Sequence, residues 1–358
     1  MKKSHLLLIM IFIGLSLTLS ACAVGPRVTG TPGVSIDGDQ VFVSYGNFVR
    51  SIDASTGLPE WQFPEEANNR IMFYAKPYVT ETHLYVGDVA NNFYKLDKEG
   101  TPEWTFSAAK GFYIGQANVA DGVVYAPNND GNLYALDDVT GDLLWTFKTN
   151  HHIWAQPVVS DDTVFVASMD HFIYKVDKDG IQIWAKELVG AVVGTPVLSE
   201  DGKILFAGTT GKQVIALDTT TRDTKWEFDA NGSLDSVWGD ILLVDDVIIF
   251  SDSSGKIFAL DAENATPKWQ NEISGSVVGG VVAIPEGFAL ASISNEESLV
   301  RTFGLDGSTK WETTLNGEVF QAPVANDSLL VAGTINGSNL LYGYNLTGVQ
   351  VWSYNPER

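Results

Sequence analysis

The side chains that most often perform chemistry in enzymes are scarce in this chain. It has one cysteine and five histidines, of which only His151 and His152 are adjacent. Neighbouring residues of an extended strand point to opposite faces, so this pair is a poor set of metal ligands. The nucleophile motif G-x-S-x-G, the zinc motif H-E-x-x-H and a phosphate-binding glycine loop do not occur in the sequence. The residues therefore indicate neither a catalytic centre nor a metal site.

Acidic residues are abundant, and their usual context is a turn. Two examples are DDVTG at 137–141 and DKDG at 177–180. An aspartate carboxylate can accept backbone N–H groups two residues on, and the glycine can adopt a positive φ. We interpret these aspartates as turn residues. The formal net charge of −22 favours solubility and argues against binding to nucleic acid or to an anionic bilayer.

The single cysteine follows a targeting segment. Lys2 and Lys3 precede an apolar stretch that is too short to span a bilayer, and residues 19–22 read LSAC. This stretch resembles the lipobox of bacterial lipoproteins, in which the thiol accepts a diacylglyceryl group and the cysteine becomes the mature N-terminus. We expect a signal peptide at 1–21, a lipid-anchored linker at 22–29 and lipidation of Cys22. The alternative is an ordinary secreted protein with a cysteine at this position.

Tryptophan recurs with a period near forty residues. Eight of the ten tryptophans are spaced 39–43 residues apart, which is the mark of a repeat architecture. A tryptophan buries roughly 150–250 Å², so we expect these eight to dock each repeat against a neighbouring repeat. They are Trp61, Trp104, Trp145, Trp184, Trp226, Trp269, Trp311 and Trp352.

Each repeat contains enough apolar runs and turns for four short strands. Runs such as VVYA at 123–126 alternate with polar hairpin sequences such as NNDGN at 128–132. Four strands in about forty residues are typical of a propeller blade. The near-continuous apolar runs indicate sheets covered on both faces. We predict an all-β fold over 30–358: an eight-bladed β-propeller of four-stranded antiparallel blades, without a second domain or a strand exchanged between its ends.

The repeat resembles the quinoprotein-type (PQQ-like) propeller family. Its form D-x-x-T-G-x-x-x-W is best kept at 53–61 and 137–145, and blade eight has Asn345 in place of the aspartate. The resemblance implies a tryptophan-docked propeller. Dehydrogenases of this family carry adjacent cysteines against the quinone and a calcium site with a catalytic aspartate, whereas this chain has one cysteine. We therefore expect no catalytic residue, cofactor or metal, and a quinone-dependent dehydrogenase is the least favoured interpretation.

A short lipoprotein that consists of such a propeller resembles the BamB-like outer-membrane assembly lipoproteins. That family scaffolds the barrel assembly machinery by docking on a periplasmic domain of its barrel subunit. The resemblance implies a monomeric, non-enzymatic scaffold that binds protein partners in the cell envelope. Ala23 after the lipidated cysteine permits sorting to an outer membrane. The alternative is an extracytoplasmic propeller that binds a small ligand or polymer, for which Tyr45, Phe48 and Tyr113 are candidate aromatic contacts.

Propellers bind through the loops around their channel, and the connectors between repeats can be aligned with one another. All seven end in two apolar residues, so we expect both positions, Trp154 and Trp238 included, to lie in the core. The preceding position varies from polar to aromatic, which indicates exposure. Our hypothesis for the partner surface comprises the larger residues at and near this position: Arg70, Met72, Lys110, Phe112, His151, His152 and Glu318.

Overall fold

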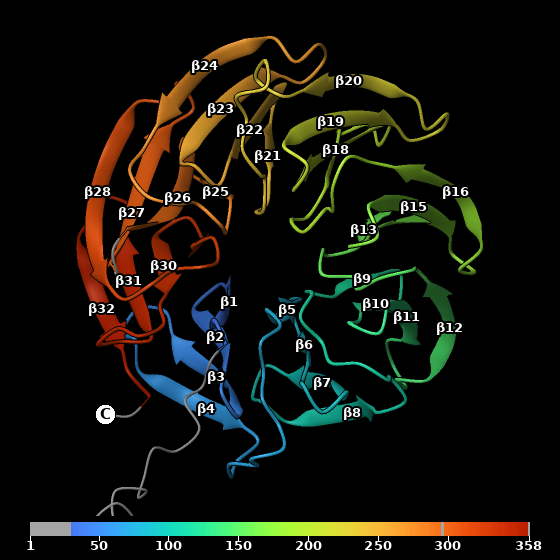
Figure 1. Cartoon of the computed structure of the whole chain (residues 1–358). Helices are drawn as coiled ribbons and strands as arrows, with labels where there is room; N and C mark the ends of the chain where they lie inside the picture. The colour runs from blue at the N-terminus through green and yellow to red at the C-terminus, as the bar shows by residue number, and fades with distance from the viewer. Residues whose placement is uncertain (1–29, 295–296, 357–358) are drawn as a thin grey trace, which may run out of the picture.

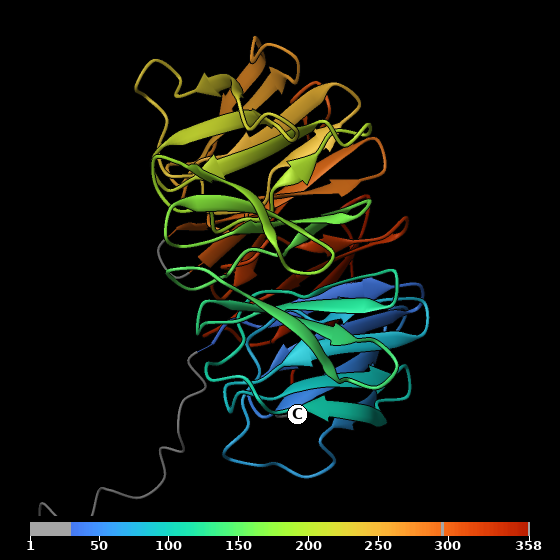
Figure 2. The same ribbon diagram turned by 90° about the vertical axis from the view of Figure 1, so that its right-hand side faces the viewer.

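The computed structural model describes residues 30–294 and 297–356; Cys22 and the expected signal peptide and linker lie outside these ranges. The described residues form 32 strands, arranged as eight four-stranded sheets. They contain no helix that could cross a membrane. Figure 1 shows the sheets as blades around a common axis. In Figure 2 the ring is seen from its rim, with the outer strands of the green and yellow blades toward the viewer. The predicted eight-bladed all-β propeller is confirmed.

Each blade consists of four antiparallel strands that follow one another in the sequence. Blades 1 to 4 contain β1 Gly33–Asp37, β2 Gln40–Tyr45, β3 Phe48–Asp53, β4 Pro59–Phe63, β5 Tyr78–Val79, β6 His83–Gly87, β7 Phe93–Asp97, β8 Pro102–Phe106, β9 Asn118–Ala120, β10 Val123–Pro127, β11 Asn132–Asp137, β12 Leu143–Lys148, β13 Val158–Ser160, β14 Thr163–Ala167, β15 Phe172–Asp177 and β16 Gln182–Glu187. Blades 5 to 8 contain β17 Val197–Leu198, β18 Ile204–Thr209, β19 Gln213–Asp218, β20 Thr224–Phe228, β21 Leu242–Val244, β22 Val247–Ser251, β23 Lys256–Asp261, β24 Pro267–Glu272, β25 Val281–Ile284, β26 Gly287–Ser294, β27 Glu297–Gly304, β28 Thr309–Asn316, β29 Val324–Ala325, β30 Leu329–Gly333, β31 Leu341–Asn345 and β32 Gln350–Tyr354.

The second and third strands of each blade form the core. In β10 and β11 every residue except the first of each strand and Asp137 is buried. Neighbouring blades cover both faces of these strands, so both sets of alternating side chains must be apolar. The first strands are short and contact one another around the axis, as β1 contacts β5 and β29. They form the innermost layer of the ring.

The fourth strand of each blade carries the periodic tryptophan. Each indole Nε1 donates a hydrogen bond of 2.6–3.1 Å to a backbone carbonyl in the next blade, in the turn between its third and fourth strands. Six of these turns place a positive-φ glycine under the indole, so closely that a Cβ on Gly141 would lie 2.7 Å from Trp104 Cδ2. A shape fit and a hydrogen bond therefore join every blade to the next.

A β-bulge precedes each of these tryptophans. In blade 3 the register between β11 and β12 shifts between Ala135 and Leu136, so that Trp145 pairs with Ala135 and Leu143 pairs with Leu136. The same shift occurs in the other seven blades. A bulge bends a strand and changes where its next side chain points, so it orients the indole toward the following blade.

The turn that receives the indole is held by the aspartate at its start. Asp137 Oδ1 accepts the backbone N–H groups of Val139 and Thr140 at 2.9 and 2.8 Å. These bonds, that from Thr140 above all, lower the pKa of Asp137. Asn345 accepts the N–H groups of two turn residues in blade 8 in the same way. An uncharged side chain can therefore form the same turn. The aspartate acts in it as a hydrogen-bond acceptor that fixes the backbone, and its charge is not required.

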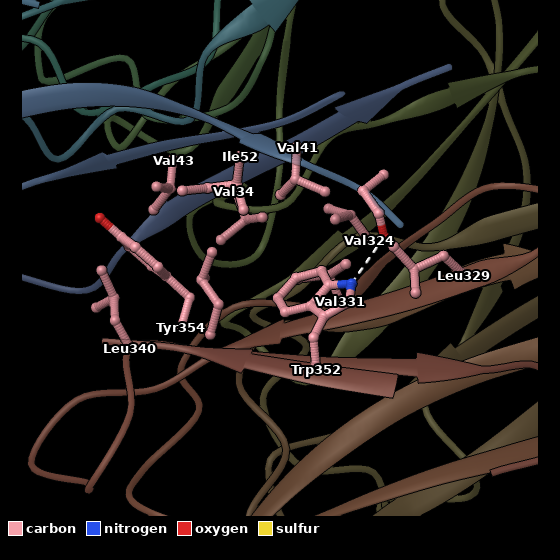
Figure 3. Packing of buried hydrophobic residues seen from close by; sticks show 12 residues of the cluster. Val34, Val41, Val43, Ile52, Val324, Leu329, Val331, Leu340, Trp352 and Tyr354 are labelled. Atoms are coloured by element: carbon pink, nitrogen blue, oxygen red, sulfur yellow. Dashed lines mark hydrogen bonds between the residues drawn. The ribbon is translucent and has the colours of Figure 1, made fainter. Parts of the chain in front are cut away.

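The ring closes between blade 8 and blade 1 by side-chain packing. Figure 3 shows Trp352 of β32 among valines and leucines from both blades, with its Nε1 directed to blade 1. That nitrogen donates a 2.7 Å hydrogen bond to the carbonyl of Ala54. Each of the two blades uses only its own consecutive strands. Closure therefore uses the same tryptophan contact as the other seven junctions, and no strand is exchanged.

We predict that Trp145→Ala destabilises the propeller without preventing its folding. The change removes a half-buried indole and the hydrogen bond to Lys178 O, which should cost about 3 kcal/mol. The measurement is the denaturation midpoint in guanidinium. Trp145→Phe is the matched control, because it keeps an aromatic ring and should cost less. A midpoint for Trp145→Ala equal to that of the wild type would contradict the docking role.

Two docking turns have a non-glycine residue at the positive-φ position, Arg222 with φ 62° and Ala265 with φ 60°. We predict that Ala265→Gly stabilises the protein by about 1 kcal/mol, because a left-handed conformation is strained for a residue with a Cβ. The reverse change, Gly141→Ala, should destabilise it by more than that, since strain and the clash with Trp104 add. Differential scanning calorimetry of the two variants measures both shifts. Shifts of the same sign would refute this account of the turn.

Candidate functional site

The seven connectors between blades lie on one face of the ring, together with the hairpins between second and third strands. The carbonyl of Phe112 accepts the N–H of Asn129 at 3.0 Å, and that of His152 accepts the N–H of Met169 at 2.9 Å. In each case the donor belongs to the hairpin of the blade that follows. The same bond is made at Met72, Ala191, Ser236, Ser276 and Glu318. The aligned connector positions are therefore structurally equivalent, and we call this side of the ring the connector face.

The hypothesised partner residues are spread along the connector face. Arg70, Lys110 and His151 are exposed, whereas Met72, Phe112, His152 and Glu318 are half-buried. Six of them belong to the three successive connectors that join blades 1 to 4, and Glu318 lies in the connector between blades 7 and 8. Of these seven described residues, only His151 and His152 are in ring contact with each other. The structure thus places these residues on one side of the ring without joining them into a single cluster.

The two adjacent histidines lie in a loop, and the expectation that they point to opposite faces is wrong. Their ring centroids are 4.2 Å apart. His152 Nδ1 is hydrogen-bonded to the carbonyl of Asn129, and its ring stacks parallel to that of Trp154. Among the described residues, no group of three His, Cys, Asp or Glu side chains could hold a metal ion. The histidine pair is part of a packed aromatic loop.

The two apolar positions that end each connector have different environments. The first is in the core, as expected, but the expectation for the second is wrong: Val237 is 1% exposed and Trp238 is 37% exposed. In six of the seven connectors the second position instead lines a cavity of about 220 Å³ at the mouth of the central channel. We call it the mouth cavity. Its apolar wall consists of Ile114, Trp154, Val193, Trp238, Val278 and Phe320. Tyr113, a candidate ligand contact from the sequence, is fully buried and lies elsewhere.

A polar ring completes the mouth cavity. It is formed by side chains two residues before the first strand of five successive blades: Lys76, Gln116, Gln156, Thr195 and Asp240. The sequence analysis missed these residues, although the strand entries AKPY, AQPV and GTPV could have been aligned to reveal them. Among the residues that the structure describes, Lys76 and Asp240 are the only charged ones that line this cavity.

Hydrogen bonds fix most members of the polar ring. Gln156 Nε2 donates to the carbonyl of Ala117 at 2.8 Å, and Asp240 Oδ1 accepts the N–H of Thr195 at 2.7 Å. Lys76 makes no hydrogen bond with the described residues. Burial lowers the pKa of its ammonium, and the negative charge of Asp240 acts in the opposite direction. Lys76 is therefore a partly desolvated donor within the electrostatic reach of one carboxylate.

Backbone forms the opposite wall of the mouth cavity. A Cβ on Gly239 would lie 2.0 Å from the nitrogen of Gly280, and one on Gly279 would lie 2.0 Å from the nitrogen of Ala322. These glycines allow the chain segments of blades 6 to 8 to touch one another directly. The close approach leaves no room for side chains at these glycines, and the polar ring of the cavity comes from blades 2 to 6.

The mouth cavity does not fit the quinone and calcium of the dehydrogenases with this type of repeat. The chain has one cysteine and so cannot supply an adjacent cysteine pair, and Asp240 is the one carboxylate among the described lining residues. Its volume of about 220 Å³ is below the roughly 300–1,000 Å³ typical of sites for molecules of that size. The geometry instead defines a tryptophan-docked propeller with a small binding cavity at one mouth.

Comparison with known proteins agrees with this class. The profile of the family described as "Outer membrane protein assembly factor BamB" matches residues 18–150, 129–279 and 276–358. The chain belongs to this family.

Individual relatives are distant. The BamB proteins of Burkholderia pseudomallei and Nitrosomonas eutropha are 26% and 25% identical, over 31% and 60% of this chain and 28% and 54% of theirs. The quinoprotein ethanol dehydrogenase of Pseudomonas aeruginosa is 29% identical over 38% of this chain and 26% of its own. The chain thus matches about a quarter to a half of the length of these relatives.

Solved structures support the fold alone. BamB from Moraxella catarrhalis superposes with a TM-score of 0.73 at 18% identity, covering 87% of this chain and 96% of that protein. The computationally designed Ika8 protein reaches a TM-score of 0.76 at 11% identity, covering 88% and 96%. A natural assembly factor and a designed protein therefore share this architecture, so function must be argued from the surfaces.

Proposed function

We propose that this chain is a lipid-anchored, extracytoplasmic scaffold that binds a protein partner during outer-membrane protein assembly, and that it is not an enzyme. The observation that carries the proposal is the connector face, on which equivalent loops of one rigid ring present side chains of different chemistry. Membership of the BamB family supports the same role. Loops held by a rigid framework are a common way to build a recognition surface.

The partner surface we propose consists of the connector residues singled out from the sequence. Met72, Phe112 and His152 are half-buried on successive connectors, and Arg70 and Lys110 are exposed beside them. Protein interfaces commonly combine a less exposed, apolar or aromatic centre with a polar rim that includes arginine. Arg70 and Lys110 give this rim positive charge, although the protein as a whole has a net charge of −22. The rim would therefore favour an acidic partner surface.

The lipid anchor belongs to the same proposal. Cys22 would carry the lipid, and residues 22–29 would connect it to the first described residue, Gly30. Eight extended residues span at most about 25–30 Å. The propeller would therefore remain close to the membrane surface, where an assembly machinery in the outer membrane could be reached. Acyl chains contribute about 0.8 kcal/mol per buried methylene, so several chains suffice for stable anchoring.

We predict that Cys22→Ser abolishes lipid attachment. Cells that express the wild-type chain with labelled palmitate should yield a labelled propeller, and the variant should carry none, because the thiol is the acceptor. Labelling is the appropriate readout, since an uncleaved signal peptide could itself hold the variant at the membrane. Ala23→Ser is the control and should label normally. Equal labelling of the wild type and Cys22→Ser would refute the anchor.

We predict that the double variant Phe112→Glu/His152→Glu loses its envelope partner. Membranes are solubilised in mild detergent, the tagged protein is captured, and co-purifying proteins are quantified by mass spectrometry. The wild type should recover a subunit of the barrel assembly machinery, and the double variant at least tenfold less of it. Val139→Glu is the control, because Val139 is 79% exposed in a turn at the opposite ends of the strands. Undiminished capture by a folded double variant would remove the connector face from the proposal.

A further inference from the structure

The mouth cavity contains one cation and one anion in a polar ring that is otherwise neutral. Lys76 precedes the first strand of blade 2, and Asp240 precedes the first strand of blade 6. In a ring of eight consecutive blades, blades 2 and 6 lie opposite each other. The negative charge of Asp240 acts on the Lys76 ammonium. The two side chains nevertheless form neither a hydrogen bond nor an ion pair with each other among the described residues. A gap therefore separates two groups of opposite charge.

Each of the two groups retains bonding capacity toward the cavity. The Lys76 ammonium can donate three hydrogen bonds and makes none with the described residues. Asp240 uses Oδ1 to accept the N–H of Thr195, which leaves its other oxygen able to accept from a ligand. Polar groups that lose water without gaining partners cost free energy. A ligand that supplies an anion to Lys76 and a cation to Asp240 would recover that cost.

The apolar wall of the cavity is already organised. Trp154 is fixed by a 3.0 Å hydrogen bond from its Nε1 to Asn129 Oδ1 and by its stacking on His152. Trp238 and Phe320 line the same cavity from blades 6 and 8, and Trp238 is 37% exposed. Aromatic rings held in place bind apolar groups with little loss of side-chain entropy. The wall therefore suits one apolar side chain.

The size of the mouth cavity limits the ligand. Its volume of about 220 Å³ is smaller than the roughly 300–1,000 Å³ of sites for drug-sized molecules. A second cavity of about 290 Å³ lies against the innermost strands and shares Lys76, Gln116 and Gln156 with it. Lys76 and the two glutamines thus lie between the two cavities, whereas Asp240 and the aromatic rings line the mouth cavity alone.

From this arrangement we infer that the mouth cavity binds the zwitterion of a free apolar or aromatic α-amino acid. Lys76 donates to the ligand carboxylate, Asp240 accepts from its α-ammonium, and the side chain lies against Trp154, Trp238 and Phe320. An unmodified α-amino acid combines both charges with one apolar group in a volume of this size. The site goes beyond the scaffold role and does not depend on the lipid; it shares with the partner residues of the connector face the stacking of Trp154 on His152.

The test is isothermal titration calorimetry of L-phenylalanine into the purified full-length protein in detergent. We expect saturable binding to one site. N-acetyl-L-phenylalanine lacks the ammonium and L-phenylalanine amide lacks the carboxylate, so each should bind at least tenfold more weakly. Lys76→Met and Asp240→Asn should each weaken binding of L-phenylalanine at least tenfold. Lys203→Met is the matched control, since it removes an exposed positive charge outside the cavity and outside the connector face, and it should bind like the wild type.

Three outcomes would overturn the inference. They are no binding at 10 mM L-phenylalanine, equal binding of the N-acetyl derivative, and unchanged affinity in folded Lys76→Met or Asp240→Asn. Equal binding of the N-acetyl derivative would indicate a site for a peptide C-terminus instead. If a variant fails to fold, Trp238→Ala provides a second test, because loss of this wall should weaken binding at least threefold. Partner capture from membranes is measured separately, so failure of one proposal leaves the other standing.

Discussion

The ring depends on one repeated contact, the indole N–H that reaches a backbone carbonyl in the next blade. A single four-stranded blade has two apolar faces and cannot bury either by itself. The tryptophan fixes how far one blade is rotated against the next, because the turn it enters leaves no room for a Cβ beneath the ring at six of the eight positions. Since Trp352 makes this contact to blade 1, no junction is left open and no edge between blades needs a strand from elsewhere.

Tryptophan docking also determines where the variable residues lie. The docked turns hold the strand ends on one side of the ring, and the connectors and second hairpins come together on the other side. There each connector accepts a backbone hydrogen bond from the next blade, so loops without regular secondary structure are tied to the ring. Side chains at one aligned position can differ from Met72 to Glu318 without altering the backbone that carries them. The exposed residues of this face can therefore vary at little cost to stability.

The sequence predicted the fold well because the information is repeated. Eight tryptophans at a near-constant period define the blade number, the outer strands and the order of the blades. A repeat with an irregular sequence can still be recognised as a blade, because the regular repeats on either side of it fix its position. The bulge before each tryptophan was not predicted, since an extra residue in a strand leaves no mark in an apolar pattern.

The candidate site was less predictable, because loops lack a fixed side-chain period. The residues at the connector ends are apolar in every repeat, yet Val237 faces the core and Trp238 faces the channel. Apolarity alone cannot distinguish a core from an apolar cavity wall. Lys76 and Asp240 were missed for a related reason. The position two residues before the first strand holds Lys, Gln, Thr or Asp in blades 2 to 6. These residues have no pattern in common in the sequence, and they lie together at the mouth cavity only because the blades form a ring.

Four connectors carry residues of both proposed surfaces, and a ring contact between the two surfaces occurs in the connector that joins blades 3 and 4. His152 belongs to the partner surface and Trp154 to the wall of the mouth cavity, and their rings lie 6.2 Å apart with planes inclined by 6°. Both side chains bond to Asn129, His152 to its carbonyl and Trp154 to its side chain. Coupling between sites requires an element with two arrangements that both ligands bias. In a ring braced at every junction, residues 151–154 join the two surfaces by a direct ring contact, so they are a route by which a bound amino acid would influence partner binding.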